Sequence, residues 1–228
     1  MNRAQMLAEL HEVLNNASLN GAFEELTLLG YLSEGQDKFC EETGYFTDIT
    51  NYALTLVTNT AVYAVPPRAI QIMDIWDGTK KLGKIRPDTV LAQDEWPSDL
   101  GTAATGRPTH WQTDQTTGFI KLTPTPTATE SGVVLALHVW RYSRYDLAGD
   151  GASAGTDAEP EIPSRFHRAC IEWAAYKAFM HHDMETQDPV KASDHLAAFR
   201  QYVADGRQAL RRVQNMETRV GSDPAYRT

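Results

Sequence analysis

The densest group of possible metal ligands lies at residues 179–188, whose sequence is FMHHDMETQD. His181 and Glu185 are four residues apart, so they would share one face of a helix, and His195 follows in the next helical segment. A HExxH zinc site needs two histidines at this spacing, with a glutamate beside the first. Here His181 and His182 are adjacent, so on a helix they point about 100° apart. A metal-dependent hydrolase that uses His181, Glu185 and His195 is one hypothesis. The interpretation that we favour is a helix end followed by a new helix, with no metal site.

Nucleophilic catalysis is not indicated either. The chain has no GxSxG motif, and Ser164 follows a proline at the start of a helical segment, where serine is typical of an N-cap. Cys170 and His167 are three residues apart, but Cys170 lies on the apolar face of its helix, which favours a buried structural thiol. The adjacent carboxylates at 41–42 and 94–95 are typical of solvated surfaces, and there is no P-loop or GxGxxG motif. We therefore predict a protein that is not an enzyme and that binds no cofactor.

The tryptophans suggest a second kind of chemistry, the stacking of sugars or bases on aromatic rings. Four of them lie in the region that is rich in predicted strands, and the alternative is that they belong to a core or to an interface. They are Trp76, Trp96, Trp111 and Trp140.

The charge of the chain is uneven. The formal net charge is −9, with 15 basic and 27 acidic side chains in residues 1–195 but six arginines and three acids in residues 196–228. An acidic body should repel nucleic acid rather than bind it. The basic end mixes arginine and tyrosine, which are enriched at protein interfaces, so we predict a docking segment, with plain disorder as the alternative. Its candidate residues are Arg211, Arg212, Arg219, Tyr226 and Arg227.

The apolar content bounds the class of protein. Hydrophobic residues make up 42% of the chain, which is enough for a core. No apolar run approaches the roughly 20 residues of a membrane span, and the first residues lack the apolar stretch of a signal peptide. We therefore expect a soluble protein that is not exported by that route.

Helices are predicted at the beginning of the chain. Residues 3–16 place apolar side chains on one helical face, and a second pattern runs from about 22 to 42. Gly30 and Gly35 weaken the second helix and suggest a bend, and Thr43-Gly44 should end it.

The residue composition and pattern between residues 51 and 145 predict five or six short antiparallel strands. Residues 54–67 and 69–76 are rich in β-branched residues, and in the second run Ile70 and Ile72 should face one side and Ile75 the other. Asp77-Gly78 predicts a hairpin with residues 80–86 as the return strand. Residues 91–108 resemble a loop with one helical turn, residues 109–124 a second hairpin, and residues 133–142 the longest strand.

Two more helices are predicted after a Gly/Pro-rich linker. The first begins at Ser164 and ends near residue 182, and the second begins with Asp188 as N-cap and Pro189 at the first helical position. The second helix should reach about Asn215, a length of roughly 40 Å, so its far end should leave the body of the domain. Its apolar residues follow a heptad-like seam: Leu196, Phe199, Val203, Gly206, Leu210 and Val213.

This order of elements predicts an α+β fold. Helices from the two ends of the chain, residues 1–50 and 160–215, should form one discontinuous bundle. Residues 51–145 should form an inserted small antiparallel β-sandwich or barrel. Residues 146–159 should be the linker, and residues 216–228 a flexible C-terminal docking tail.

The same order resembles the head-to-tail adaptor proteins of tailed bacteriophages, the podovirus-type group similar to tail tubular protein A. The resemblance covers residues 5–215 by layout, and it depends on the combination of motifs rather than on any one of them. The motifs are FCEETG, YAVPPRAIQIMDIWDGTKKL, GRPTHWQTD, GFIKLTPTP, VVLALHVWRYSRYDL, EIPSRFHRACIEWAAYKAFMHHD and DPVKASDHLAAF.

The resemblance implies a structural virion protein at the capsid vertex, assembled in the host cytoplasm. Such adaptors form a ring, usually of twelve copies, between the portal and a tail or nozzle protein, and genomic DNA passes through the ring without specific binding. The helical part would surround the DNA, the C-terminal segment would reach the portal, and the β insertion would face outward or toward the tail. Its candidate tail-facing residues are Trp76, Asp77, Lys80 and Trp96. A carbohydrate- or nucleic-acid-binding module that uses the tryptophans is the alternative function.

Overall fold

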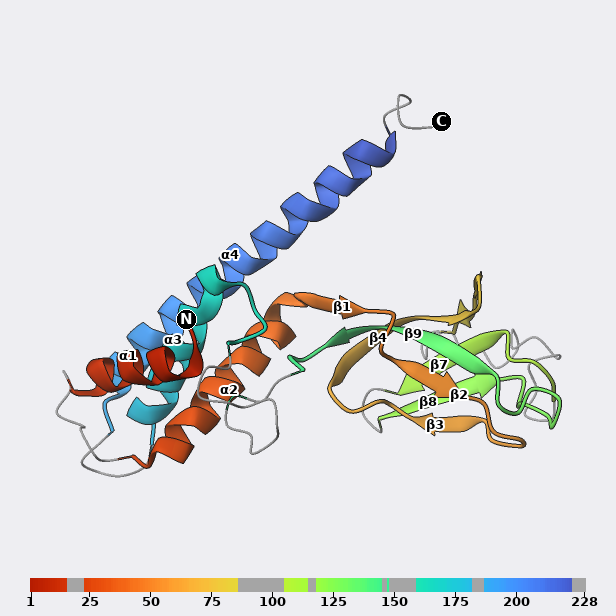
Figure 1. Cartoon of the computed structure of the whole chain (residues 1–228), viewed down its shortest axis with the longest axis horizontal. Coiled ribbons are helices and arrows are strands. Elements are labelled where there is room, and N and C mark those ends of the chain that lie inside the picture. The colour runs from red at the N-terminus through yellow and green to blue at the C-terminus, as the bar shows by residue number, and fades with distance from the viewer. Residues whose placement is uncertain are drawn as a thin grey trace. The chain divides into compact units, whose positions relative to one another are not determined.

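The computed structural model describes residues 1–15, 23–85, 105–114, 118–144, 147, 159–181 and 187–222, and within them the side chains of Asn15, Asp114 and residues 214–222 are left aside. The chain forms two compact units (Figure 1). Unit 1 comprises Met1–Phe46 and Tyr142–Thr228, and unit 2 comprises Thr47–Arg141. Unit 1 is helical and unit 2 is made of strands, which confirms the predicted α+β class.

Unit 1 is a bundle of helices from both ends of the chain. The helices are α1 (Arg3–Asn15), α2 (Glu25–Thr43), α3 (His167–Phe179) and α4 (Pro189–Ser222). The α3 helix lies at the centre, since it contacts α1, α2 and α4. Apolar side chains from all four helices form the core of unit 1, because one face of each helix is apolar. They include Met6, Leu10, Leu28, Leu32, Phe39, Phe179 and Phe199.

Two of the three predicted helix-capping residues are confirmed. Gly44 has a φ of +63°, and its N–H donates to the Cys40 carbonyl, so it ends α2 as expected. Asp188 caps α4, since its Oδ1 accepts hydrogen bonds from the N–H groups of Val190 (3.2 Å) and Lys191 (3.1 Å). The N-cap assigned to Ser164 is wrong. A 3-10 turn, Ser164–Phe166, precedes α3, and its cap position is Pro163.

Gly35 does not bend α2, which is continuous from Glu25 to Thr43. A Cβ atom at Gly35 would lie 3.0 Å from the Cα atom and from the carbonyl oxygen of Cys170, so the glycine permits close packing of α2 on α3. Gly206 plays the same part between α4 and α2, because a Cβ atom there would lie 2.8 Å from Cζ of Phe39. Gly35 was interpreted as the site of a bend, but it is required for the close packing of α2 on α3.

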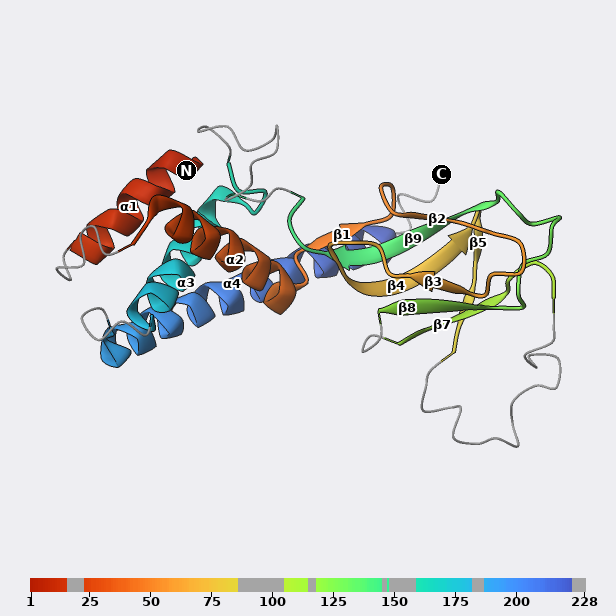
Figure 2. The same cartoon turned by 90° about the horizontal axis from the view of Figure 1, so that it is seen from below.

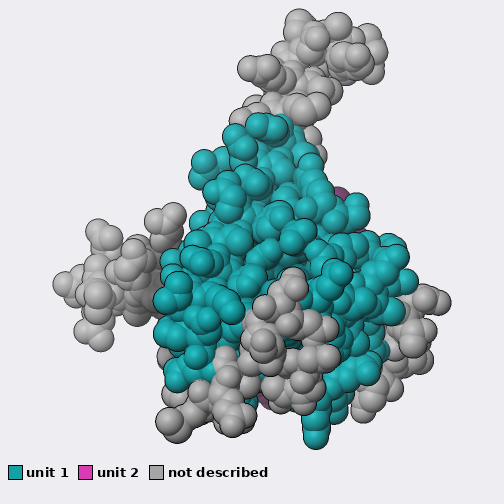
Figure 3. Space-filling view, turned by 90° about the vertical axis from the view of Figure 1, so that its left-hand side faces the viewer, with its two compact units in different colours: residues 1–46, 142–228 teal, residues 47–141 magenta. Residues whose placement is uncertain are grey.

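The α4 helix is longer than predicted. It has 34 residues, which is about 50 Å, and it ends at Ser222 rather than near Asn215. Residues 216–222 were predicted to be part of a flexible tail, but they are helical. Figure 1 shows the C-terminal half of α4 projecting from the other helices of unit 1, and Figure 3 shows the teal surface of unit 1 narrowing toward the top of the view. The expected overhang is therefore present.

Unit 2 is a two-layered arrangement of nine strands within the residues described. One sheet has the order β1-β9-β4-β5, with β2 also paired to β9, and the other has the order β3-β8-β7-β6. The two layers lie face to face, with β7 and β8 below β4 and β9 in Figure 2. The strands are β1 (Phe46–Asp48), β2 (Ala53–Thr55), β3 (Val62–Ala64), β4 (Ala69–Asp77), β5 (Lys80–Lys81), β6 (Gly83–Lys84), β7 (His110–Asp114), β8 (Phe119–Thr123) and β9 (Val134–Arg141).

One core fills the space between the two sheets of unit 2. Leu54, Ile75 and Leu137 come from the first sheet, and Trp111 and Ile120 come from the second. All five are buried. Both sheets therefore turn one apolar face inward, as the predicted sandwich requires.

Three strand predictions need correction. The register of β4 against β9 shifts between Ile72 and Asp74, so Ile72 and Ile75 are both buried instead of facing opposite sides. The return strand after Gly78 is split, because β5 pairs with β4 whereas β6 joins the second sheet in parallel to β7. The predicted count of five or six strands is too low, because nine are described and residues 53–64 alone contain two of them, β2 and β3, in different sheets. The loop predicted at 91–108 lies largely outside the described residues, and so does most of the predicted linker.

Candidate functional site

The structure does not bring the predicted metal ligands together within the part that it describes. His195 is bound to Glu172, with 2.7 Å between Nδ1 and Oε2, and its ring stacks on Phe179 at a centroid distance of 5.4 Å. His181 instead contacts Phe23 edge-on. Glu185 lies outside the described residues. No group of three His, Cys, Asp or Glu side chains among the described residues could hold a metal ion.

Glu172 is the polar centre of the contact between α3 and α4. It accepts hydrogen bonds from His195 (2.7 Å) and from Arg168 Nε (3.3 Å), and Arg168 also lies 3.1 Å from Glu9 on α1. Burial would raise the pKa of Glu172, but the bonds from His195 and Arg168 outweigh it, so this pKa lies below its ordinary value. The carboxylate therefore stays charged and ties three helices together.

Cys170 and His167 do not form a nucleophilic pair. Cys170 is buried in the bundle, and burial raises the pKa of its thiol far above neutral pH. The Nε2 atom of His167 lies 2.8 Å from the Ile162 carbonyl, to which it donates, because a carbonyl can only accept. Both residues are structural.

None of the three tryptophans that the structure describes in unit 2 is an exposed side chain. Trp111 is completely buried in the core, where Lys84 Nζ lies 4.8 Å from its ring centre. Trp76 and Trp140 are half-buried, and Trp96 lies outside the described residues. The platform hypothesis therefore loses Trp111.

The candidate tail-facing residues lie at the turn between β4 and β5. Asp77 and Lys80 are paired across this hairpin, and Gly78 begins its two-residue loop with a φ of +58°. Arg107 binds Asp77 through two hydrogen bonds, Nε to Oδ2 at 2.6 Å and Nη2 to Oδ1 at 2.7 Å. These bonds lower the pKa of Asp77. Trp76 precedes the turn, and Lys80 is exposed, so the turn combines a carboxylate held by Arg107 with an exposed cationic side chain.

The candidate docking residues lie on the projecting part of α4. Arg207 is the last residue of α4, among the described side chains, that binds another helix: its Nε donates to the Glu42 carbonyl at 2.7 Å and its Nη2 to Glu42 Oε2 at 2.8 Å. We call residues 208–222 the α4 overhang. Arg211 and Arg212 are exposed on it. The side chain of Arg219 and residues Tyr226 and Arg227 lie outside the description.

The α4 seam continues into the overhang. Of the predicted seam, Phe199, Val203 and Gly206 are buried and Leu196 is half-buried, on a helix that contacts α2 and α3. Leu210 is half-buried, and Val213 is 54% exposed. Among the described side chains, the seam is therefore packed at Phe199, Val203 and Gly206 and exposed at Val213.

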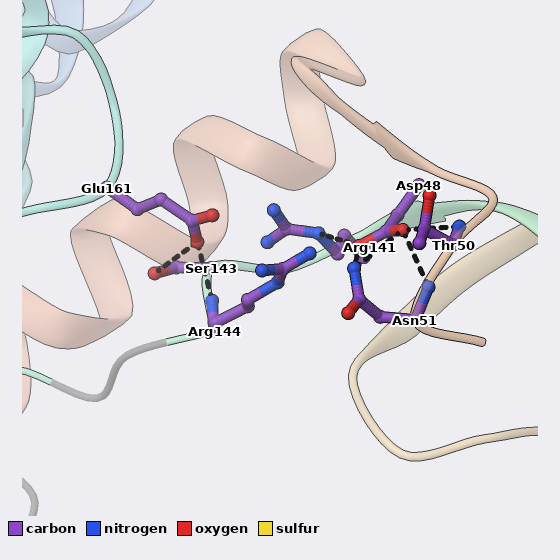
Figure 4. A network of polar contacts seen from close by, with 7 residues as sticks. All are labelled: Asp48, Thr50, Asn51, Arg141, Ser143, Arg144 and Glu161. Carbon is purple, nitrogen blue, oxygen red and sulfur yellow. Dashed lines mark hydrogen bonds and ion pairs between the residues drawn. The ribbon is translucent and has the colours of Figure 1, made fainter. Parts of the chain in front are cut away.

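Sequence reasoning missed two polar anchors, which Figure 4 shows. In unit 2, Asp48 at the end of β1 faces Arg141 at the end of β9, with 3.4 Å between Oδ2 and Nε, and both side chains are buried. Asp48 also accepts hydrogen bonds from the backbone N–H groups of Thr50 and Asn51.

The second anchor lies in unit 1, where Glu161 accepts hydrogen bonds from the Arg144 N–H (2.7 Å) and the Ser143 hydroxyl (3.4 Å). The partners in both anchors are far apart in sequence, so no local pattern could reveal them. A hint was available only in Asp48 and Arg141 themselves, because each is a charged residue at the end of a strand.

None of the helices in the described part of the chain has the length and apolarity needed to cross a membrane. Comparison with known proteins gives a family assignment. The sequence model of a family described as "SU10 adaptor protein" matches residues 1–222, and no curated protein matches significantly. The match spans both units, including the whole of α4, and agrees with the resemblance to phage head-to-tail adaptors. The chain therefore belongs to the SU10 adaptor protein family and is a bacteriophage adaptor with a structural role.

Proposed function

We propose that this adaptor forms a ring, of twelve copies, that joins the portal of the virion to its tail and lines the passage for DNA. The observation that carries the proposal is the α4 overhang. Its helix extends about 22 Å beyond Arg207, and its seam ends in the exposed Val213. Contact with other copies or with the portal would cover this exposed side chain.

The distribution of charge supports a DNA passage. Unit 1 has 13 basic and 21 acidic side chains, so it carries −8 of the net charge of −9. Carboxylates repel phosphates, so a passage lined by this unit lets DNA slide without binding. A ring with these contacts would lie in the neck of the virion.

We propose separate roles for the two units. The overhang and the residues after it would bind the portal through Arg211, Arg212, Arg219, Tyr226 and Arg227. The turn at Trp76, Asp77 and Lys80, with Trp96, would face the tail protein. Arg107 supports this role for the turn, since it holds Asp77 in one orientation.

Electron microscopy of the purified chain mixed with the portal protein of the same phage tests the proposal. We expect rings stacked on one face of the portal, with Val213→Asp or truncation after Arg207 reducing their number. The truncation leaves the buried part of the α4 seam intact, and circular dichroism checks that the bundle still folds. A chain that stays monomeric and does not bind the portal would contradict the adaptor role.

A further inference from the structure

The first residue of the chain lies against the start of α3. The α-amino nitrogen of Met1 is 2.9 Å from Nδ1 of His167, although 166 positions separate the two residues in sequence. His167 is buried, with 1% of its surface exposed, and its Nε2 atom is 2.8 Å from the Ile162 carbonyl oxygen. Both ring nitrogens are therefore engaged within unit 1, one of them by the terminus that is marked N in Figure 1.

The two hydrogen bonds determine where the protons lie. Because a carbonyl can only accept, Nε2 carries the proton of the neutral imidazole, and Nδ1 presents a lone pair. An ammonium group has donors and no acceptor, so the amino group of Met1 donates to Nδ1. A hydrogen bond from a charged donor is shorter and stronger than one between neutral groups. In this tautomer, His167 is therefore an acceptor suited to a cationic amine.

The electrostatic surroundings make such an acceptor necessary. The ammonium group lies at the N-terminal ends of two helices, since α1 begins at Arg3 and α3 at His167, and a helix dipole is positive at this end. A cation is unfavourable there unless an acceptor compensates it. Burial, together with the charge of the ammonium group, lowers the pKa of His167, and the carboxylate of Glu159 opposes this shift without reversing it. The ring therefore keeps its Nδ1 lone pair at neutral pH.

The first turn of α1 is built to hold the amino group in place. The Asn2 N–H donates to Gln5 Oε1, and the Gln5 N–H donates to Asn2 Oδ1, both at 2.9 Å, which is the reciprocal pattern of a capping box. This pair fixes the backbone at the residue that follows Met1. Later turns of α1 dock through a buried apolar stripe and through Glu9, which lies 3.1 Å from Arg168 on α3.

We propose that His167 is the binding site of the α-amino group of Met1, and that unit 1 thereby distinguishes a free amino group at this position from an acylated one. An acylated nitrogen belongs to an uncharged amide with one N–H, so its hydrogen bond to Nδ1 is weaker. The acyl group must also be accommodated beside a buried ring. Acylation should therefore loosen the docking of α1 on α3. The proposal is independent of the proposed ring and of its contacts with the portal.

Hydrogen exchange of the free and the formylated chain tests the proposal. The formyl group is the acyl group that bacterial translation places on its first methionine, and an inhibitor of peptide deformylase retains it, as mass spectrometry can verify. We expect the N–H groups of residues 7–14 in α1 to exchange about fivefold faster in the formylated native chain, because hydrogen bonds from charged donors are about twice as strong as neutral ones.

The variant His167→Gln isolates the contact. Its side-chain amide can still donate to the Ile162 carbonyl, but it leaves no acceptor at the position of Nδ1. The free and the formylated forms of this variant should therefore exchange alike. Formylation removes the unfavourable interaction with the helix dipoles in both chains, so the comparison between them cancels this effect. Equal effects of formylation in the native chain and in His167→Gln would overturn the proposal.

The matched control is His167→Asn. Its Oδ1 can replace Nδ1 as the acceptor, whereas the donor to the Ile162 carbonyl is lost, so formylation should still speed the exchange of α1. Loss of the formyl effect in this variant as well as in His167→Gln would assign the effect to a disturbed start of α3, and the proposal would fail.

A one-residue extension gives a test that leaves the bundle unchanged. A glycine added before Met1 turns its amino nitrogen into an amide and moves the ammonium group by one residue, so α1 should exchange faster. A glycine added after Thr228 should change nothing. Unchanged exchange of α1 in the chain extended before Met1 would contradict the proposal, and it would leave the adaptor role standing.

Discussion

The buried pair of Asp48 and Arg141 is a residue-scale determinant of unit 2. Breaking a buried ion pair by removing one partner usually costs about 3–5 kcal/mol, because it leaves the other charge uncompensated. We expect Asp48→Ala to lower the free energy of unfolding by an amount in this range, measured by urea denaturation.

The control for this prediction is the more exposed pair of Lys81 and Asp74, 2.6 Å apart in the same unit, whose side chains are 51% and 21% exposed. Lys81→Ala should lower the free energy of unfolding by less than about 1 kcal/mol, because solvent screens the pair. Equal losses for the two variants would show that burial of Asp48 and Arg141 does not matter.

His167 should make unit 1 sensitive to mild acid. Burial lowers the pKa of His167 below the unfolded value of about 6.5, and this effect exceeds that of the bond to the Ile162 carbonyl. Below that value the unfolded chain binds a proton that the folded chain does not, so stability is lost as the pH falls from about 6.5 toward the folded pKa.

The measurement is the melting temperature of the native chain and of His167→Gln at several pH values between 7.5 and 5.0. We expect the native chain to lose more stability on acidification than the variant does, whatever their difference at pH 7.5. Parallel curves would contradict the assignment to His167.

At the scale of the elements, two glycines of α2 separate helix propensity from packing. A Cβ atom at Gly30 has nothing within 4 Å, whereas one at Gly35 meets the backbone of Cys170 at 3.0 Å. Alanine favours a helix over glycine by about 1 kcal/mol, and overpacking typically costs about 1–3 kcal/mol. We expect Gly30→Ala to stabilise the protein by up to about 1 kcal/mol and Gly35→Ala to destabilise it.

Thermal and urea unfolding of the two variants measure the difference. Because both changes lie in one helix and add the same methyl group, they control for each other. Stabilisation by Gly35→Ala would mean that α2 and α3 can separate slightly without loss.

The elements that sequence reasoning predicted are those with strong local signals. Asp188-Pro189 starts α4, Gly44 ends α2, and Asp77-Gly78 marks the β4–β5 turn. The failures have non-local causes. Periodicity cannot show that β6 leaves β5 for the other sheet, or that a bulge turns Ile72 and Ile75 to the same side. Gly35 was misinterpreted for the same reason, since its partner Cys170 lies on another helix.

The candidate site was predictable to a smaller degree. The α4 seam and the arginines that follow it were visible as spacing and composition. The sequence did not reveal the residue at which the seam becomes exposed, because this depends on where α2 ends beside Gly206. The pairing of His195 with Glu172 was missed because the metal hypothesis considered only His181 and Glu185 as neighbours of His195.

For the whole molecule, the net charge of −9 predicts weak contact with DNA. We expect no shift of linear duplex DNA in gel electrophoresis with the chain in large excess at about 0.15 M salt, where exposed charges are screened beyond about 8 Å. A basic DNA-binding protein at the same concentration serves as the positive control. Retention of DNA that weakens as salt is raised would contradict a non-binding passage.

The position of Asp48 and Arg141 has a consequence for the history of the protein. They are close to the first and last residues of unit 2, and their strands β1 and β9 are neighbours in one sheet. A module whose two ends are adjacent can be exchanged by recombination at two points without stretching the host domain. Phages that share the helical unit could therefore acquire a different sheet unit in a single genetic step.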